Sequence, residues 1–134
     1  MPSPFTWPVR VYYEDTDAGG IVYYANYLKF FERARTEWLR ALGIYQQALL
    51  DQEGAAFVVR SATVEYIAAA RLDDEINLHL TVEKLGRASV QFRQEAWRGD
   101  MLLSTAAVKV GCIDAASMRP RALPDDAAAK MRAG

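Results

Sequence analysis

The chain has 134 residues, of which 51% are hydrophobic and 25% are charged, which is ordinary for a globular domain. Sixteen Lys and Arg against 17 Asp and Glu give a formal net charge of −1, so no basic excess points to nucleic acid. The length predicts a single domain over residues 1–134. The start has no charged region followed by an apolar run, so we expect no signal peptide, no membrane span and, by default, a cytoplasmic location.

The first half of the chain predicts a strand followed by a long helix. The run VRVYY (9–13) is rich in residues that favour strands. Residues 26–42 carry apolar side chains at steps of four and three, which predicts an amphipathic helix; they are Tyr27, Phe31, Ala34, Trp38 and Ala41.

Side chains at the ends of this helix suggest how it starts and stops. We expect Asn26 to cap the start and Gly43 to end the helix. Arg33 and Glu37 are four residues apart and are predicted to pair on the exposed face. A second, short helical segment is predicted to stop at Gly54.

From Ala56 onward, the apolar period changes to two. Four strands are predicted, AFVVRSATVEYIA, INLHLTVEKL, SVQFRQEAW and MLLSTAAVKVGCID, with GRA and RGD as hairpin turns. A strand, a long helix and four antiparallel strands predict an α+β fold in which one helix packs on a five-stranded sheet. A sheet without a second layer exposes an edge and apolar surface, which favours oligomerisation.

The stretch DTDAGGIVYYANY (15–27) combines acids, glycines and aromatic rings at the turn before the helix. Asp15, Asp17 and Gly20 fit three positions of a calcium-binding EF-hand loop. However, Gly19 and Asn26 fall where that loop needs ligands, so we expect no metal.

Two other interpretations of this turn stay open from spacing alone. A plain loop suits the Asp, Thr and Gly content. An acyl-transfer site is also possible, because glycines allow a ligand to approach closely and the N–H groups at a helix start favour an oxyanion. A nearby carboxylate could then act as nucleophile or base.

The segment YEDTDAGGIVYYANYLKFFERARTEWL resembles the motif of hotdog-fold acyl-CoA thioesterases. The family pattern Asp-x-Asp-x-x-Gly-x-Val, followed by Asn-Tyr, is matched by Asp15, Asp17, Gly20, Val22, Asn26 and Tyr27. The stretches FVVRSATVEYIAAARLDDEI and MRPRALP are also similar to this family, so the resemblance covers nearly the whole chain. It implies a hotdog fold, in which a five-stranded antiparallel sheet wraps a long central helix.

Two branches of the family are most similar. They are the Tol-Pal-associated, YbgC-like thioesterases and the 4-hydroxybenzoyl-CoA thioesterases (4HBT). The first usually has His where this chain has Tyr24, whereas the second has Tyr. This difference leaves the acyl preference open.

The resemblance also implies roles for individual residues. Asp17 matches the catalytic carboxylate, which either attacks the thioester carbonyl or activates a water molecule. Gly20 and the backbone N–H near Tyr24 would position the substrate and its developing oxyanion, whereas Asp15 would brace the loop. The expected acyl pocket is lined by Val22, Tyr23 and Tyr27.

Coenzyme A carries phosphates, so the site needs cations at its rim. Lys84 and Arg87 flank the predicted hairpin KLGRAS and are the first candidates, together with Arg60. Arg119 and Arg121 are further candidates, and a solvated surface charge is an equal alternative for each.

The single histidine and the single cysteine are not expected to be catalytic. His79 lies on the polar face of a regular strand, and no nucleophile elbow accompanies it, so a Ser-His-Asp triad is not predicted. Cys112 lies among apolar residues of the last strand and is expected to be a packed thiol.

These features predict hydrolysis of an acyl-CoA thioester to a free acid and CoA, without a metal or other cofactor. The resemblance implies a homodimer or homotetramer with its sites at a dimer interface. One alternative is a dehydratase of acyl thioesters, which the position of His79 disfavours. Another is a non-enzymatic or dual-role module that binds an acyl carrier protein or phospholipid-synthesis enzymes, against which Asp17 argues. Acyl length and the choice between CoA and carrier protein stay open.

Overall fold

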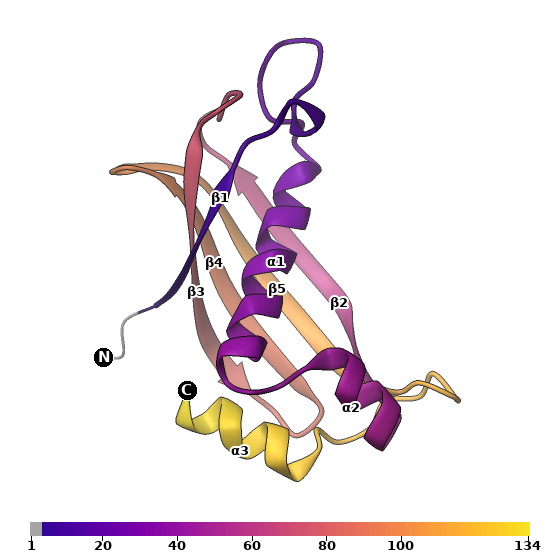
Figure 1. Ribbon diagram of the computed structural model, residues 1–134. Helices are drawn as coiled ribbons and strands as arrows, with labels where there is room; N and C mark the ends of the chain where they lie inside the picture. The colour runs from indigo at the N-terminus through magenta and orange to yellow at the C-terminus, as the bar shows by residue number, and fades with distance from the viewer. Residues whose placement is uncertain (1–3) are drawn as a thin grey trace.

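The computed structural model describes residues 4–134 and contains one long helix against one antiparallel sheet (Figure 1). The sheet order is β1-β3-β4-β5-β2, so β1 and β2 form the two edges. The strands are β1 (Phe5–Arg10), β2 (Ala55–Tyr66), β3 (Glu75–Leu85), β4 (Ser89–Arg98) and β5 (Met101–Asp114), and the long helix is α1 (Asn26–Ala41). The predicted α+β arrangement is confirmed. Among the described residues, no helix is long and apolar enough to cross a bilayer.

The core lies between α1 and the inner face of the sheet. Alternate residues of β3, among them Ile76 and Leu78, are fully buried on this face. The opposite face carries mainly polar side chains, such as His79 and Thr81, so the sheet needs no second layer there. Exposed apolar surface instead occurs beside the β2 edge, where Val59 is 53% exposed.

The long helix follows its apolar period closely. Tyr27, Phe31, Ala34 and Trp38 are buried as predicted, whereas Ala41 is exposed. Gly43 follows the helix with φ of 81°, a left-handed conformation that ends it as expected.

Two predictions about this helix are wrong. Ala25 occupies the N-cap position, and Asn26, one residue later, turns its side chain toward Asp15 instead of capping the helix. Glu37 pairs with Arg40 at 2.6 Å rather than with Arg33, whose guanidinium lies over the Phe30 ring.

The first strand starts and ends earlier than predicted. β1 covers Phe5–Arg10, and residues 13–15 form a short 3-10 helix instead of extending the strand. Pro8 lies inside this strand, which is tolerated because β1 is an edge strand that, within residues 4–134, pairs with β3 alone.

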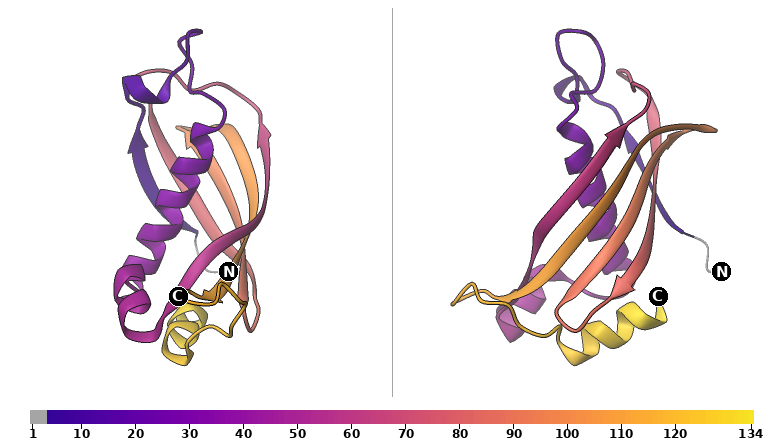
Figure 2. Two further views of the ribbon diagram at one scale, coloured as in Figure 1. Left: turned by 90° about the vertical axis from the view of Figure 1, so that its right-hand side faces the viewer. Right: turned by 180° about the vertical axis from the view of Figure 1, so that it is seen from behind.

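Two shorter helices pack at the end of the sheet opposite to the start of α1 (Figures 1 and 2). α2 (Gln46–Glu53) stops at Gly54 as predicted. α3 (Asp125–Ala133) was not predicted, although its sequence has two acids in the first turn and Lys130 and Arg132 in the last, which suits the helix dipole. Ala127, Ala128 and Met131 of α3 close the core at this end.

Candidate active site

The acidic turn, defined here as residues 15–22, forms a loop that projects from the sheet just before α1 (Figure 1). The backbone N–H of Asp17 donates to the carbonyl of Ile21 at 2.9 Å, and Gly20 donates back to the carbonyl of Asp17 at 3.0 Å. Gly20 has φ of 80°, which L side chains rarely adopt. The glycine is therefore needed to close this turn.

Asp15 braces the turn from inside. Its carboxylate is 4% exposed and accepts hydrogen bonds from the Tyr12 N–H at 2.8 Å and from Asn26 Nδ2 at 2.7 Å. Its backbone carbonyl accepts a further bond from the Tyr23 N–H. These contacts support the structural role predicted for Asp15.

Asp17, in contrast, is exposed on the loop. Its Oδ1 accepts a hydrogen bond from the Gly19 N–H at 2.8 Å, an Asx-type turn contact. Across the part of the chain that the structure describes, Oδ2 has no hydrogen-bond partner. The carboxylate is thus oriented through one oxygen while the other stays available for chemistry.

The N-terminal end of α1 lies directly after the acidic turn and offers a backbone donor. The N–H groups of Asn26 and Tyr27 donate to the carbonyls of Tyr23 and Tyr24. Within residues 4–134 the Tyr24 N–H has no partner, so it is free to bind an oxyanion at the positive end of the helix dipole.

The segment between β2 and β3 holds the turn and the helix together. The carbonyl of Ala70 accepts from the Val22 N–H at 2.9 Å, and the N–H of Ala70 donates to the Tyr27 hydroxyl at 3.3 Å. Burial raises the pKa of Tyr27, so its hydroxyl keeps its proton at neutral pH. The Tyr27 hydroxyl therefore holds Ala70 in place by a hydrogen bond and does not act as a base.

The same segment is fixed to β4 by a charged pair. Arg98 Nη1 lies 2.9 Å from Asp74 Oδ2 and 3.0 Å from the Ala69 carbonyl. Partial burial opposes ionisation, but the Arg71 N–H and the Arg98 guanidinium together hold the pKa of Asp74 below its ordinary value. The ion pair between Asp74 and Arg98 thus fixes the segment that contains Ala70.

A cavity of about 230 Å³ opens beside the turn. It is lined by Ile21, Val22, Tyr24 and Tyr27 on one side and by residues 66–69 on the other. Of the acyl-pocket residues predicted from the resemblance, Val22 and Tyr27 line it and Tyr23 does not; the Tyr23 ring packs beside Tyr24, with ring centroids 4.9 Å apart.

Tyr66, the last residue of β2, was not among the predicted site residues. Its ring meets Tyr24 and Tyr27 edge to face, at centroid distances of 5.9 and 5.6 Å. No spacing signal connects position 66 with the acidic turn, because the sheet brings them together across some 40 residues. Only its aromatic character at a strand end could have marked it.

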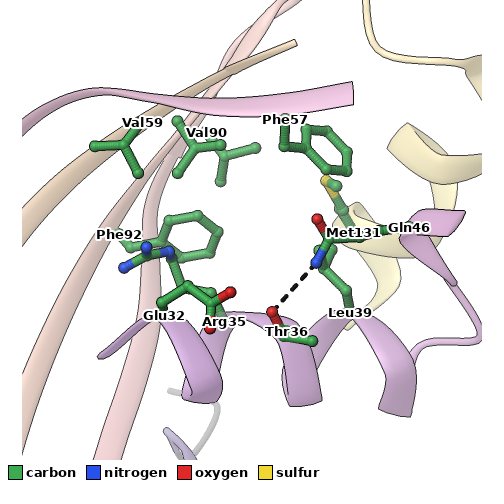
Figure 3. A pocket seen from close by; sticks show the side chains of 11 residues that line it. Glu32, Arg35, Thr36, Leu39, Gln46, Phe57, Val59, Val90, Phe92 and Met131 are labelled. Carbon is green, nitrogen blue, oxygen red and sulfur yellow. Dashed lines mark hydrogen bonds between the residues drawn. The ribbon is translucent and has the colours of Figure 1, made fainter. Parts of the chain in front are cut away.

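Two other hollows flank α1 farther from the turn. One, of about 120 Å³, lies between the helix and the sheet near α2, where Gln46 donates to the Thr36 hydroxyl at 3.2 Å (Figure 3). The other is a groove of about 560 Å³ between α1 and β2, lined in part by Leu28, Val59 and Ala62. Neither is lined by a predicted site residue.

The predicted CoA-binding cations do not lie beside Asp17 in the same chain. Lys84 and Arg87 are at the far end of β3, which at about 3.3 Å per residue places them roughly 30 Å along the sheet from the acidic turn. Arg60 lies at a bulge in the middle of β2, with its alkyl chain over Gly111. One chain alone therefore does not gather these cations and the carboxylate.

The two residues not expected to act lie outside the site. His79 is on the outer face of the sheet, stacked on Trp97 at a centroid distance of 5.9 Å. Cys112 is 1% exposed, and burial raises the pKa of its thiol. Neither side chain lines the cavity beside the acidic turn.

A long helix on an antiparallel sheet, with an exposed carboxylate and a free N–H at the helix start, is the arrangement expected of a hotdog-fold thioesterase. Comparison with known proteins agrees with this class: residues 19–105 match the model of the thioesterase superfamily (4HBT). The chain is 50% identical over 126 residues to the acyl-CoA thioesterase YbgC of Haemophilus influenzae, covering 94% of this chain and 93% of that protein. It is also 50% identical over 129 residues to the acyl-CoA thioester hydrolase YbgC of Escherichia coli O157:H7, covering 96% of each.

Solved structures show the same fold. A probable thioesterase from Bartonella henselae superposes with a TM-score of 0.85 at 34% identity, covering 89% of this chain and 98% of that one. A hypothetical protein from Aquifex aeolicus gives a TM-score of 0.87 at 30% identity, covering 96% and 99%. The chain belongs to the thioesterase superfamily and has the hotdog fold, as the sequence resemblance implied.

Proposed function

We propose that this protein hydrolyses acyl-CoA thioesters to a free acid and CoA, with Asp17 as the catalytic carboxylate. Membership of the thioesterase superfamily and 50% identity to proteins named as acyl-CoA thioesterases support the reaction. The observation that carries the assignment of Asp17 is its exposed carboxylate, positioned by the Gly19 N–H just before the free N–H of Tyr24.

The geometry suggests how the reaction would proceed. The acyl group enters the cavity beside the turn, and its carbonyl oxygen accepts a hydrogen bond from the Tyr24 N–H, which stabilises the negative charge that develops. Asp17 then attacks the carbonyl carbon, the C–S bond breaks, and CoA leaves as a thiolate that takes up a proton. Water hydrolyses the resulting mixed anhydride. In the alternative, Asp17 removes a proton from a water molecule that attacks the carbonyl directly.

A homodimer would complete this site. On the outer side of β2, no strand pairs with it within residues 4–134, and exposed apolar side chains, including Leu28 and Val59, lie beside that edge. Antiparallel pairing of β2 with the same strand of a second copy would bring the far end of one sheet next to the acidic turn of the other.

This pairing also accounts for the position of the cations. Lys84 and Arg87 are exposed and distant from their own Asp17, but the two-fold operation would carry them toward the partner's acidic turn, whereas Arg60, in the middle of β2, would stay near the two-fold axis. At that turn, Lys84 and Arg87 would bind the phosphates of CoA. The dimer is the smallest unit in which carboxylate and cations meet.

An acyl carrier protein is a second possible donor of the acyl group, because it presents its cargo on the same kind of thioester. We propose a cytoplasmic location, where the unpaired Cys112 would stay reduced. Hydrolysis of matched acyl-CoA and acyl-carrier-protein substrates would rank the two donors.

Replacing Asp17 by Asn tests the proposal. The change keeps the size of the side chain but removes its charge, so kcat should fall by a factor of about 10² or more. Asp100→Asn, at an exposed turn between β4 and β5, is the matched control and should behave like wild type. A folded Asp17→Asn protein with near wild-type kcat would remove Asp17 from the mechanism.

A further inference from the structure

Ala70, in the segment between β2 and β3, is bonded to two parts of the candidate site. Its carbonyl accepts from the Val22 N–H at 2.9 Å, which fixes the second half of the acidic turn. Its N–H donates to the Tyr27 hydroxyl at 3.3 Å, which fixes the first turn of α1. Tyr24, whose N–H is the proposed oxyanion donor, lies in the chain between Val22 and Tyr27. The position of Ala70 therefore affects how the acidic turn and the helix start face each other.

Asp17 is linked to this segment through the acidic turn. Its N–H donates to the Ile21 carbonyl at 2.9 Å, and Ile21 forms an antiparallel bridge with Arg71. Residues 69–71 thus lie beside the second half of the turn as a neighbouring strand would, and Asp17 lies on its other side. A shift of residues 69–71 would carry the Asp17 backbone, and with it the carboxylate, to a new position.

One side chain from the sheet holds the middle of this segment. The segment begins at Ile67 and Ala68, whose N–H groups are bonded to β5, and it ends in a turn closed by Asp74. Between these ends, the Ala69 carbonyl accepts a hydrogen bond from Arg98 Nη1 at 3.0 Å, its only partner among the described residues. The same nitrogen lies 2.9 Å from Asp74 Oδ2. Arg98 therefore joins the middle of the segment to its end.

Arg98 lies near the helix start but outside the reacting groups. Burial is the main cause of the raised pKa of Tyr27, and the Ala70 N–H and the positive charge of Arg98 both oppose that rise. Arg98 does not line the cavity beside the acidic turn, and within residues 4–134 none of its hydrogen bonds reaches Asp17 or Tyr24. Any effect of Arg98 on the reaction is therefore exerted through the segment that it holds.

We propose that Arg98 is a positioning residue for the proposed hydrolysis, because its bond to Ala69 sets the separation of the Asp17 carboxylate and the Tyr24 N–H. The inference rests on the proposed function, since it concerns the same site. The contacts that support it are formed within one chain and involve no residue of β2, so they do not depend on the proposed dimer. A displacement of about 1 Å between reacting groups can lower a rate by about 10².

Arg98→Met tests this role, and Arg10→Met is the matched control. Arg10 also binds one backbone carbonyl, that of Asp73 at 2.7 Å, and one carboxylate, that of Glu75 at 3.1 Å, but it does not contact residues 69–71. With free thiol as the readout, Arg98→Met should lower kcat for the best acyl-CoA of a small panel by about tenfold and change KM by less than about threefold. Arg10→Met should keep both constants within about twofold of wild type.

Hydrogen exchange of the Val22 and Ala70 amides needs no substrate, so it separates this inference from the proposed function. Exchange should be about tenfold faster in Arg98→Met than in wild type and unchanged in Arg10→Met. If exchange changes in this way but wild type hydrolyses no acyl-CoA, Arg98 holds the acidic turn as inferred and only the proposed reaction fails.

Two results would overturn the role of Arg98 itself. One is hydrolysis that depends on Asp17 while a folded Arg98→Met protein keeps the wild-type kcat, or loses no more of it than Arg10→Met does. The other is exchange of both amides at the wild-type rate in Arg98→Met.

Discussion

Asp15 Oδ1 accepts a hydrogen bond from Asn26 Nδ2 at 2.7 Å, and this single contact ties the acidic turn to the first residue of α1. Both side chains are nearly buried, at 4% and 9% exposure. The contact fixes the direction in which the chain enters the helix. It therefore determines where the Tyr24 N–H points relative to the Asp17 carboxylate.

Replacing Asn26 by Ala should destabilise the fold more than a surface change does. The Asp15 carboxylate would lose a partner while staying buried, which costs about 2 kcal/mol. Urea unfolding of Asn26→Ala, Asp15→Ala and the double variant measures the coupling energy, expected to be about 1.5–3 kcal/mol. Purely additive effects would contradict the bracing role of this pair.

Loss of Arg87 should weaken substrate binding rather than slow the chemical step. Phosphate contacts are equal in the ground and transition states, so Arg87→Ala should raise KM for acyl-CoA about tenfold and leave kcat nearly unchanged. Arg93→Ala removes an exposed cation from the outer face of β4 and serves as the control. An unchanged KM would mean that the phosphates of CoA bind at Arg119, Arg121 or elsewhere.

Mixed dimers test whether Arg87 acts across the subunit boundary. If one subunit supplies Asp17 and its partner supplies Arg87, a dimer of one Asp17→Asn and one Arg87→Ala chain has one intact site. Exchange of equal amounts gives about half mixed dimers, so activity at low substrate should return to about a quarter of wild type.

The alternative makes an opposite prediction for the same mixture. If both residues served the same site within one chain, every site in the mixture would lack one of them, and no activity would return on mixing. Light scattering on each protein at micromolar concentration verifies the oligomer, and an active wild-type monomer would contradict the shared site.

The Asp74–Arg98 pair should make part of the stability depend on pH. Because the pKa of Asp74 is lowered in the folded protein, its contribution is present above the unfolded value of 3.8 and is lost as the pH falls through the lower, folded value. The pair is partly exposed, so we expect about 1 kcal/mol, or a Tm difference of about 4 °C, between wild type and Asp74→Asn at pH 7.

This difference should shrink when melting is followed from pH 7 down to pH 3. Asp100→Asn controls for removal of an exposed acid and should show little change at any pH. A constant Tm difference between wild type and Asp74→Asn from pH 7 to pH 3 would mean that the charge of the Asp74 carboxylate does not stabilise the segment between β2 and β3.

Local patterns predicted most of the fold. The period of α1, the alternation in β3 and the left-handed glycine at position 43 act within a few residues of sequence, so they could be recognised without the structure. α3 was missed because its short, alanine-rich sequence carries little apolar period. Asn26 was assigned as a cap because its competing partner, Asp15, is brought to it only by the turn.

The candidate site was predicted in part, for the same physical reason. Gly20 and Asp17 lie in one local turn, and family resemblance gave them roles that spacing alone left open. Tyr66 and Ala70 reach the turn only through sheet pairing and the loop after β2, so no local pattern indicates them. Arg87 lies in the hairpin that follows the far end of β3, and local sequence patterns do not encode its distance from the acidic turn.

Among the residues that the structure describes, β2 pairs only with β5, the last strand, although it is the second strand in chain order. On the ribosome, α1 and β2 emerge early but cannot be fixed in the sheet until Met101–Asp114 has also emerged. Until then, the apolar face of α1 and the strand that ends in Tyr66 are uncovered. The elements that form the site are thus synthesised before the strand that fixes them in the sheet. The incomplete chain therefore exposes apolar surface of the kind that chaperones bind.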